Sequence, residues 1–313
     1  MLYGKYQFLC RLENEALLPF YKGSTFRGVF GRALKKVVCA LKRQECSQCL
    51  LKQRCVYALV FETSDALQLP AGSKVASPPH PYVIEPPLTT ETHFEQGSSF
   101  DFNLLLFGKT NDNLPYFIYA FDQMGKIGIG KKNNGKRGKF ILKKVISDNH
   151  IIYSNTDQKI NKIDFPASLS LTKTSDYPKG SFCLRLILET PLRIKFENKL
   201  KADLPFHVLV RAVLRRISSL FNTYGSGEPS LDYRELVKQA ETVNIVNDSL
   251  EWFDWRRYSF RQDKAMLMGG IVGSIVYEGE IGAFMPFIQF CEKVHLGKQT
   301  SFGLGKIKAE IIS

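Results

Sequence analysis

The chain has 313 residues, enough for two domains of ordinary size with buried cores. Its composition of 44% hydrophobic, 23% charged and 12% aromatic residues is that of a folded soluble protein, and it excludes disordered, collagen-like and disulfide-knot chains. The 43 lysines and arginines outnumber the 30 aspartates and glutamates and leave a net charge of +13, which favours a polyanionic partner such as nucleic acid or an anionic membrane surface.

No segment predicts a membrane span or a signal peptide. The longest apolar stretch, at 266–277, is interrupted by glycines and is shorter than the roughly 18 residues that cross a bilayer. The N-terminus carries Lys5, Arg11 and Glu13 where a signal peptide needs an unbroken apolar run. The cytoplasm is therefore the expected compartment. No basic amphipathic segment stands out to favour a membrane over nucleic acid.

The first half of the chain predicts a strand, a helix, two strands, a helix and a strand. A strand-like run at 8–13 precedes 26–41 (FRGVFGRALKKVVCAL), whose apolar residues recur with the 3.6-residue period of an amphipathic helix. Strands are expected at 82–85 and 100–107. A second helix opens near a proline in 114–130 and runs into a glycine-rich loop, after which a further strand is expected.

Four of the seven cysteines follow the first helix closely, at Cys39, Cys46, Cys49 and Cys55. Disulfides are not expected in a reducing cytoplasm. A C-x2-C turn can present two thiolates to one metal, and two further cysteines complete a tetrahedral shell. The pattern predicts a structural Zn(II) site. An iron–sulfur cluster and unmetallated cysteines remain alternatives, because the outer spacings match no common zinc finger.

The second half repeats the order of the first. Residues 206–221 (FHVLVRAVLRRISSLF) align with 26–41 without a gap, and the same six apolar positions recur. A strand-like run at 182–187 precedes this helix, and 285–297 predicts the second helix, again leading into a glycine-rich loop and a strand. Strands are expected at 255–261 and 267–277, and a short helix near 231–241 within an insertion at 222–250.

Each half thus predicts a β-α-β-β-α-β order. We expect an α+β protein of tandem ferredoxin-like (RRM-like) domains, in which two helices cover one face of an antiparallel four-stranded sheet and the first domain carries the four-cysteine insertion. Polar segments at 154–164 and 172–180 predict a linker, so the predicted domains are residues 1–175 and 176–313. Because this architecture serves many functions, function must be argued from individual residues.

The two glycine-rich loops carry the densest candidate RNA contacts. In the second, glycines would let backbone N–H groups approach phosphate oxygens while lysines and hydroxyls add donors; the residues are Gly297, Lys298, Thr300, Ser301, Gly303, Gly305 and Lys306. In the first, Lys131, Lys132, Lys136 and Arg137 are expected to follow a phosphate backbone. The alternatives are a turn that packs a helix on a strand and, for the first loop, a solvated loop.

A predicted hairpin before the glycines of 266–277 carries further candidates. They are Arg256, Arg257, Tyr258, Arg261 and Gln262. Arginines interleaved with aromatic side chains can hold phosphates and stack bases, so RNA is expected along this hairpin. A solvated basic strand face is the alternative.

Four segments of the sequence resemble the CRISPR-associated endoribonucleases of the RAMP superfamily that process precursor crRNA. They are HLGKQTSFGLGKI (295–307), RRYSFRQDKAMLMGGIVG (256–273), KGSTFRGVFGRAL (22–34) and the cysteine cluster followed by YALVFE (57–62). The resemblance implies tandem ferredoxin-like domains, in agreement with the internal repeat. It further implies cleavage of CRISPR repeat RNA without a catalytic metal: the 2′-hydroxyl attacks the adjacent phosphate and leaves a 2′,3′-cyclic phosphate and a 5′-hydroxyl. The implied partners are the repeat stem-loop, mature crRNA and other CRISPR effector subunits.

The catalytic residues are less clearly marked. Metal-free transesterification needs a base, an acid and a cation for the phosphorane. Relatives often place a histidine on or just before the first helix, where this chain has Arg32, which stays protonated. His295 directly precedes the second glycine-rich loop and is the predicted acid or base, with Tyr21, Lys22 and Arg27 for orientation and charge. A core or capping role for His295 is the alternative, and His207 is the next candidate.

Two other functions remain open at this point. A noncatalytic crRNA-binding subunit of the same superfamily would keep the fold and the basic loops, and the missing helix histidine favours it. A zinc-stabilised nucleic-acid-binding structural protein unrelated to CRISPR is the second alternative.

Overall fold

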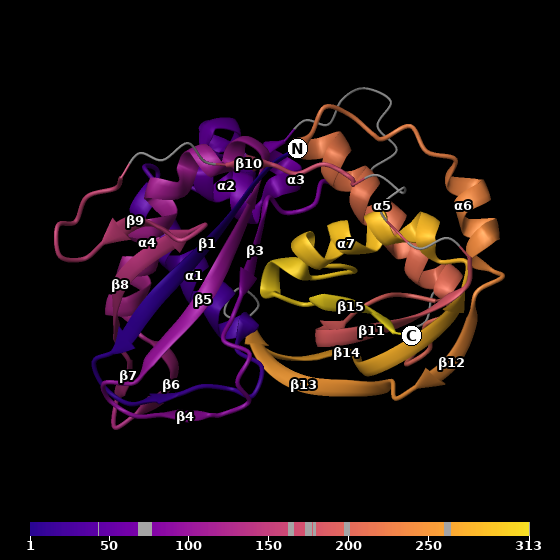
Figure 1. The fold of residues 1–313 in the computed structure, drawn as a ribbon. Helices are drawn as coiled ribbons and strands as arrows, with labels where there is room; N and C mark the ends of the chain where they lie inside the picture. Colours follow the sequence, from indigo (N-terminus) through magenta and orange to yellow (C-terminus); the bar gives the residue numbers. More distant parts are fainter. Residues whose placement is uncertain are drawn as a thin grey trace. The chain divides into compact units, whose positions relative to one another are not determined.

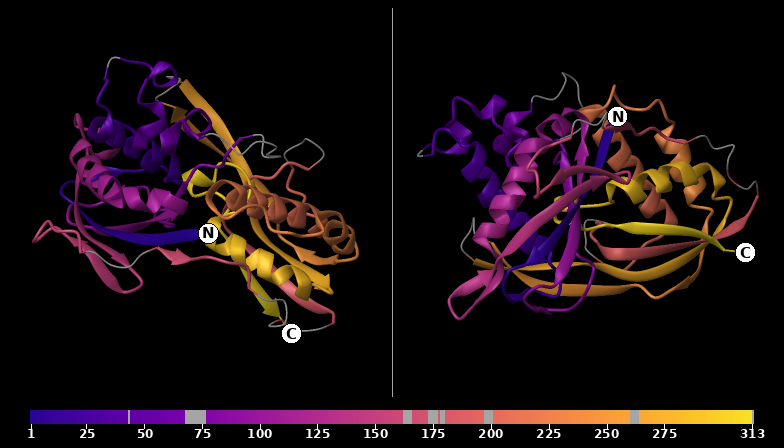
Figure 2. Two further views of the ribbon diagram at one scale, coloured as in Figure 1. Left: turned by 90° about the horizontal axis from the view of Figure 1, so that it is seen from above. Right: turned by 60° about the vertical axis from the view of Figure 1, so that its left-hand side comes forward.

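The computed structural model describes residues 1–42, 44–67, 77–161, 166–172, 177, 180–196, 201–259 and 264–312 (Figures 1 and 2). The chain divides into two compact units, Met1–Ser168 and Leu169–Ser313; the predicted boundary of 175 lies slightly beyond that division. Three antiparallel sheets and their helices make up the described residues, so the predicted α+β class is confirmed. None of the described helices is long and apolar enough to cross a membrane.

The main sheet of the first unit has the strand order β3 (Tyr82–Glu85), β5 (Ser99–Phe107), β1 (Leu2–Leu12), β8 (Phe140–Ser147) and β9 (His150–Ser154), and β10 (Ala167–Ser168) also pairs with β1. Helix α1 (Gly23–Val38) connects to β3, and α4 (Leu114–Ile127) follows β5 after the 3-10 helix η3 (Gly108–Asn113). Strands β1, β3, β5 and β8 therefore have the order that the predicted β-α-β-β-α-β unit requires.

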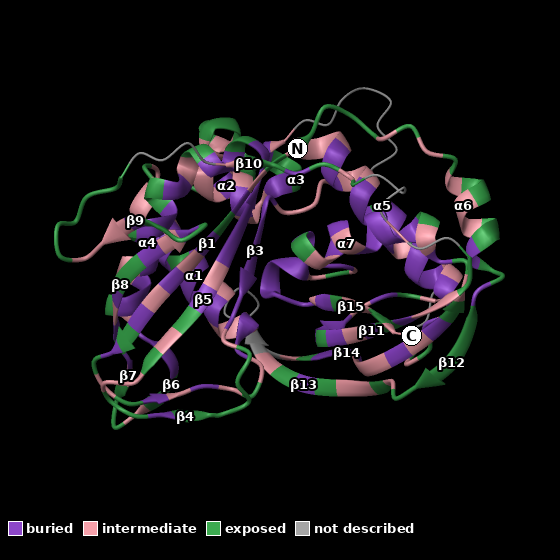
Figure 3. Ribbon diagram, viewed as in Figure 1, coloured by how far each residue is buried: buried purple, intermediate pink, exposed green. Residues whose placement is uncertain are grey.

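Helices α1 and α4 cover one face of this sheet. Phe26 of α1 packs against Phe102 of β5 with ring centroids 5.2 Å apart, and Phe121 of α4 packs against Phe8 of β1 at 4.7 Å. Phe8 and Phe102 stack on each other at 4.9 Å, so they share a face, and Phe30 of α1 stacks on Phe121 at 4.4 Å. Buried and more exposed residues alternate along β1, as expected for a sheet with one covered face (Figure 3).

A second, small sheet in the first unit was not predicted. Its order is β4 (His93–Phe94), β2 (Ala16–Leu17), β6 (Ile129–Asn133) and β7 (Lys136–Gly138). The glycine-rich loop expected after α4 is thus mostly a hairpin, turned at Asn134 and Gly135, whose φ angles of 47° and 79° suit a tight primed turn. Gly130 has φ 81°, and a Cβ there would collide with the Leu17 carbonyl, so glycine lets β6 lie against β2.

Between α1 and β3 lies the cysteine segment. It consists of the 3-10 helices η1 (Cys46–Gln48) and η2 (Lys52–Arg54) and the short helices α2 (Val56–Phe61) and α3 (Thr63–Ala66). Its place after the first helix is the predicted one. The predicted helix at 26–41 ends earlier, at Val38, because the backbone turns to an extended conformation at Cys39.

The main sheet of the second unit has the order β12 (Asn244–Asp248), β14 (Lys264–Gly279), β11 (Phe182–Leu192) and β15 (Ile307–Ile312), and β13 (Glu251–Ser259) forms a long hairpin with β14. Helices α5 (Phe206–Tyr224) and α7 (Met285–Val294) lie on one side of these strands (Figure 1). Phe206 of α5 packs on Tyr277 of β14 at 4.9 Å. The predicted short helix is α6 (Tyr233–Ala240), and β12 within the same insertion was not predicted.

Candidate RNA-binding and catalytic residues

The glycine-rich loop between α7 and β15 is bonded to its own chain. The backbone N–H of Leu296 donates to the Gly305 carbonyl at 2.8 Å, that of Lys298 to Arg193 at 2.9 Å and that of Gly305 to Pro191 at 3.1 Å. Gly305 has φ 74°, and a Cβ there would collide with the Leu296 carbonyl. These glycines and N–H groups thus hold the loop, which includes the 3-10 helix η6 (Thr300–Phe302), against the end of β11. The geometry is therefore that of the alternative, a turn that packs a helix against a strand. These three N–H groups are bonded to the chain's own carbonyls and do not form the predicted phosphate site.

The side chains of this loop differ in their exposure and therefore in whether they can contact RNA. The predicted residues Thr300, Ser301, Gly303 and Gly305 are buried, and Gly297 is half-buried. Lys306 is half-buried, and its Nζ lies 3.4 Å from a Glu189 carboxylate oxygen. Lys298 is exposed. Among the loop residues predicted to bind RNA, Lys298 is therefore the cation best placed to meet a phosphate.

His295 has no exposed surface. It is the C-cap of α7, and its Nδ1 lies 3.0 Å from the Leu304 carbonyl, which can only accept, so this nitrogen carries the proton. A ring without exposed surface cannot exchange a proton with RNA outside the protein. The structure therefore argues against the predicted catalytic role and gives His295 the capping role that was its alternative.

A buried arginine completes this capping arrangement. Arg216 of α5 donates through Nε to the His295 carbonyl at 3.1 Å and through a terminal nitrogen to the Val294 carbonyl at 2.7 Å. Burial lowers the pKa of Arg216 to about 10, which leaves the guanidinium charged at neutral pH. A cation at the negative end of the α7 dipole is the favourable arrangement. Arg216 thus fixes the start of the glycine-rich loop.

Lys22 and Tyr21, predicted to assist catalysis, precede α1. Lys22 is buried; its Nζ donates to the carbonyls of Phe20 at 3.2 Å and Thr89 at 2.5 Å, and burial lowers its pKa. Tyr21 is half-buried, and burial, together with the charge of Glu85, raises the pKa of its phenol. The ammonium of Lys22 is therefore engaged within the protein rather than presented to a substrate.

Arg27, the fourth predicted catalytic residue, lies beside a histidine that the sequence did not single out. Its guanidinium lies over the Phe61 ring, 5.0 Å from the centroid, and one terminal nitrogen is 3.5 Å from Nε2 of His80. Both Arg27 and His80 are half-buried. The contact between Arg27 and Phe61 joins KGSTFRGVFGRAL (22–34) and YALVFE (57–62), two of the segments that carry the family resemblance. A Cβ on Gly31 would lie 2.9 Å from the Phe61 ring, so the glycine of the first motif admits the phenylalanine of the second.

The hydrogen bonds of His80 assign its tautomer. Its Nδ1 lies 2.8 Å from the hydroxyl oxygen of Thr63, and that hydroxyl donates to the Leu59 carbonyl at 2.9 Å. The hydroxyl proton is thus committed to the carbonyl, and His80 donates from Nδ1. In the neutral ring, Nε2 therefore carries the lone pair, and it faces Arg27. The proline-rich neighbours of His80 predict an ordinary surface loop, and only the convergence of the two motifs in the fold brings it beside Arg27.

The long β13–β14 hairpin carries the second group of predicted RNA contacts. Arg256 is exposed, and the guanidinium of Arg257 lies 5.0 Å from the centroid of the Phe302 ring in the glycine-rich loop. Arg193, which was not predicted, donates to the Gly269 carbonyl of β14 at 2.7 Å and accepts the N–H of Lys298. The hairpin and the loop thus form one connected basic surface. Arg261 and Gln262, and the side chain of Tyr258, lie outside the described residues.

The predicted cations of the first unit lie on the β6–β7 hairpin. Lys131, Lys132 and Lys136 are exposed, and Arg137 is half-buried and donates to the Gly130 carbonyl at 2.6 Å. Arg32 of α1 is exposed, and its pKa is lowered by partial burial and by the charge of Arg137.

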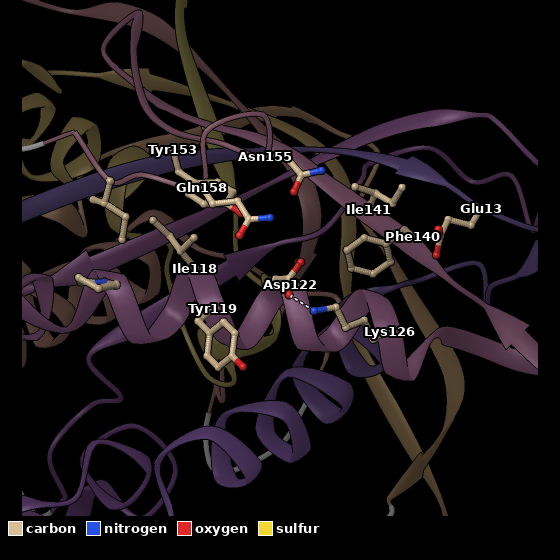
Figure 4. Close-up of a pocket in the computed structure, with 12 residues that line it drawn as sticks. Glu13, Ile118, Tyr119, Asp122, Lys126, Phe140, Ile141, Tyr153, Asn155 and Gln158 are labelled. Atoms are coloured by element: carbon tan, nitrogen blue, oxygen red, sulfur yellow. Dashed lines mark hydrogen bonds and ion pairs between the residues drawn. The ribbon is translucent and has the colours of Figure 1, made fainter.

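An open pocket of the first unit contains none of the predicted residues. It lies between α4 and the β8–β9 region, and Figure 4 shows Tyr119, Asp122 and Lys126 on its α4 side. Asp122 and Lys126 form an ion pair of 2.7 Å within it. The only lysine of this pocket is thus already paired, and the pocket offers little to a phosphate.

The four cysteines of the predicted metal site come together. Cys39, Cys46, Cys49 and Cys55 are unbridged and half-buried, and all four line one small pocket. Among the described residues, no group of three or more His, Cys, Asp or Glu side chains is already arranged to hold a metal ion. The convergence of the cysteines follows the prediction, while the metal itself remains a prediction.

Comparison with known proteins identifies the family. Residues 186–307 match the family model of the CRISPR-associated endoribonuclease Cas6, and residues 1–165 match the model AF_1859_N, described as an N-terminal domain. Residues 186–307 of the chain belong to the Cas6 family of CRISPR-associated endoribonucleases. This match argues against the alternative of a structural protein unrelated to CRISPR.

Individual relatives are similar to this chain in sequence or in fold. An uncharacterized protein of Archaeoglobus fulgidus is 27% identical over 292 residues, which cover 92% of this chain and 91% of that protein. A Thermus thermophilus Cas6 product complex is similar with a TM-score of 0.56 at 12% identity, over 98% of this chain and 100% of that one. A chain of a partial Cas6-RT-Cas1–Cas2 complex gives 0.58 at 12% identity over 99% of this chain; this chain spans only 46% of that one.

Replacing the buried arginine should loosen the C-terminal unit. Arg216→Met leaves the carbonyls of Val294 and His295 without their charged donor and should lower the free energy of unfolding by about 2 kcal/mol. Arg215→Met, one residue away and exposed, is the matched control and should change it by less than about 0.5 kcal/mol. Urea denaturation followed by circular dichroism measures both, and equal effects would contradict the capping role.

Removing the exposed loop lysine should weaken RNA binding at every sequence. Lys298→Ala should reduce the slope of log affinity against log salt by about 0.7 for single-stranded RNA if this lysine contacts one phosphate. The control is Lys308→Ala, because Lys308 is also exposed but is paired with Glu310 at 2.7 Å. Filter binding across a salt series measures the slope. If the salt slope of Lys298→Ala equals that of Lys308→Ala, Lys298 makes no phosphate contact.

Proposed function

We propose that this chain processes precursor crRNA by cutting one phosphodiester within or beside the CRISPR repeat, through attack of the 2′-hydroxyl on the adjacent phosphate. Membership of residues 186–307 in the Cas6 endoribonuclease family supports the substrate class. The observation that carries the chemistry is the pairing of Arg27 with His80, which places a titratable ring nitrogen next to a permanent cation on a partly exposed surface.

His80 takes the role of general base in this proposal. In its neutral tautomer Nε2 can accept the proton of the 2′-hydroxyl, and histidine is the side chain whose ordinary pKa lies nearest neutrality. The 2′-oxygen bonds to phosphorus, and the bond from phosphorus to the 5′-oxygen breaks. The leaving oxygen takes a proton from solvent or from the imidazolium. The products are a 2′,3′-cyclic phosphate and a 5′-hydroxyl, so no metal ion is required.

Arg27 supplies the charge that the phosphorane needs. Its guanidinium is always protonated, and the Phe61 ring beneath it restricts its position, so it is pre-organised for an anion. The Thr63 hydroxyl holds His80 from the other side. A base and a cation thus lie within one hydrogen-bond distance of each other.

The second unit contributes binding in this proposal. Lys298, Arg256 and Arg257 lie on or beside the connected basic surface of the hairpin and the loop, and they suit contacts with the backbone of the repeat stem-loop or of mature crRNA. An association with other CRISPR proteins is also consistent with the Cas6-RT-Cas1–Cas2 complex, whose chain this protein matches over part of its length.

The second candidate function is a crRNA-binding subunit that does not cut. The burial of His295 favours it, because the histidine next to the glycine-rich loop is then not available for chemistry. Such a subunit would bind repeat RNA through the same basic surface. It would leave the RNA uncut in every assay.

The two candidates differ in single-turnover cleavage. With a matching repeat RNA in EDTA, the wild-type protein should cut, and His80→Ala should slow cutting by about 10²-fold or more with little change in RNA affinity. His150→Ala, at an exposed turn of the first unit, is the matched control and should cut at the wild-type rate. No cutting by wild type would favour the noncatalytic subunit.

A modified substrate tests the mechanism separately from the residue. A 2′-deoxy nucleotide at the cleavage position should abolish cutting whichever side chain is the base. Cutting of that substrate would overturn 2′-hydroxyl attack. If His80→Ala cuts at the wild-type rate, the base lies elsewhere even though the activity stands.

A further inference from the structure

We infer that the cysteine segment, residues 39–57, is held by one structural Zn(II) bound to Cys39, Cys46, Cys49 and Cys55. This inference concerns the stability of the segment and does not depend on the proposed cleavage.

Each cysteine lies where the backbone turns. Cys39 follows α1, Cys46 opens η1, Cys49 follows η1, and Cys55 lies between η2 and α2. Cys39, Cys49 and Cys55 all have an extended backbone conformation, with ψ of 110°, 126° and 120°. Three turns of one short segment thus direct thiols toward the same small pocket.

The segment has no hydrophobic core of its own. Between residues 39 and 57, no described residue is buried, and residue 43 is outside the description. The 3-10 helices η1 and η2 contain no buried residue, and Leu50 is 76% exposed. Apart from Val56, every half-buried residue of this stretch lines the cysteine pocket, so the four thiols form the interior of the segment.

Two short 3-10 helices without a core need a cross-link to keep one conformation. Small folds of this kind are stabilised by disulfides or by a bound metal, and in such folds the free energy of metal binding is free energy of folding. The cysteines are unbridged. Among the described residues the four thiols are not yet close enough to one another to bind a metal ion. We infer that zinc binding brings them together within the pocket that all four line.

The charges around the pocket suit a thiolate site. Four thiolates on Zn(II) carry a net charge of −2, which needs compensation at a half-buried position. Lys52 lines the pocket, and Lys35 of α1 lies over the ring of Tyr57, another pocket residue, at 5.4 Å. Four sulfur ligands at a tetrahedral site favour zinc or iron–sulfur chemistry, and the d¹⁰ ion matches a site with a purely structural purpose.

Metal content tests the site directly. Full-length protein prepared without chelators should contain about one zinc per chain by elemental analysis. Cys46→Ser with Cys49→Ser should lower that content at least about tenfold, because half of the ligands are lost. Cys183→Ser is the control, since Cys183 is also half-buried but lies on β11, and it should keep the zinc. A metal-free wild type, an iron chromophore or a double variant that keeps its zinc would overturn the inference.

A second measurement uses only wild-type protein, so it does not require a cysteine variant to fold. Wild-type protein stripped of metal should take up one equivalent of Co(II) and develop the sulfur-to-cobalt absorption of a tetrahedral thiolate site. Trypsin should cut at exposed Lys42 or Arg54 faster in the stripped protein than in the loaded one. Octahedral cobalt spectra, or equal cutting rates with and without metal, would overturn the inference.

Discussion

A buried guanidinium at the end of α7 decides what the glycine-rich loop can do. Arg216 takes the last carbonyls of the helix, His295 turns its ring inward to Leu304, and the glycines then let the loop lie backbone to backbone against the end of β11. In this packing the N–H groups of Leu296, Lys298 and Gly305 are bonded to carbonyls of the chain, so they do not bind a phosphate. What the loop presents to a partner is therefore mainly the side chain of Lys298, because the ring of Phe302 is buried beneath Arg257.

One aligned position of the internal repeat, Arg216 in α5 and Lys36 in α1, has a different role in each half. Arg216 of α5 aligns with Lys36 of α1, which is exposed. In α5 the helix continues to Tyr224 and supports the loop, whereas α1 ends at Val38 and gives way to the cysteine segment. That segment leads into α2, whose Phe61 packs on Gly31 and under Arg27. The repeat thus yields one half built around a loop and another built around the Arg27–His80 pair.

The sequence predicted the elements with a clear apolar pattern and missed those without one. Helices α1 and α5 could be placed because their apolar residues repeat every 3.6 residues, and strands β3 and β5 because each is a short run rich in apolar residues. The strands β2 and β4 have two residues each and carry no such pattern. The burial of His295 could not be predicted, because position along the chain does not reveal whether a ring faces inward. His80 was passed over because its partners, Thr63 and Arg27, are distant in the sequence and meet it only in the fold.

The central claim is that the phosphate to be cut lies beside Arg27 and His80 in the first unit, while the loop at 295–306 serves to bind and position. Photo-crosslinking tests this most directly, with a repeat RNA that carries 4-thiouridine next to the cleavage position and a 2′-deoxy block at it. The account predicts crosslinked peptides that contain Arg27 or His80, and the loss of that crosslink in Arg27→Ala. Crosslinks confined to the glycine-rich loop around His295 would contradict it.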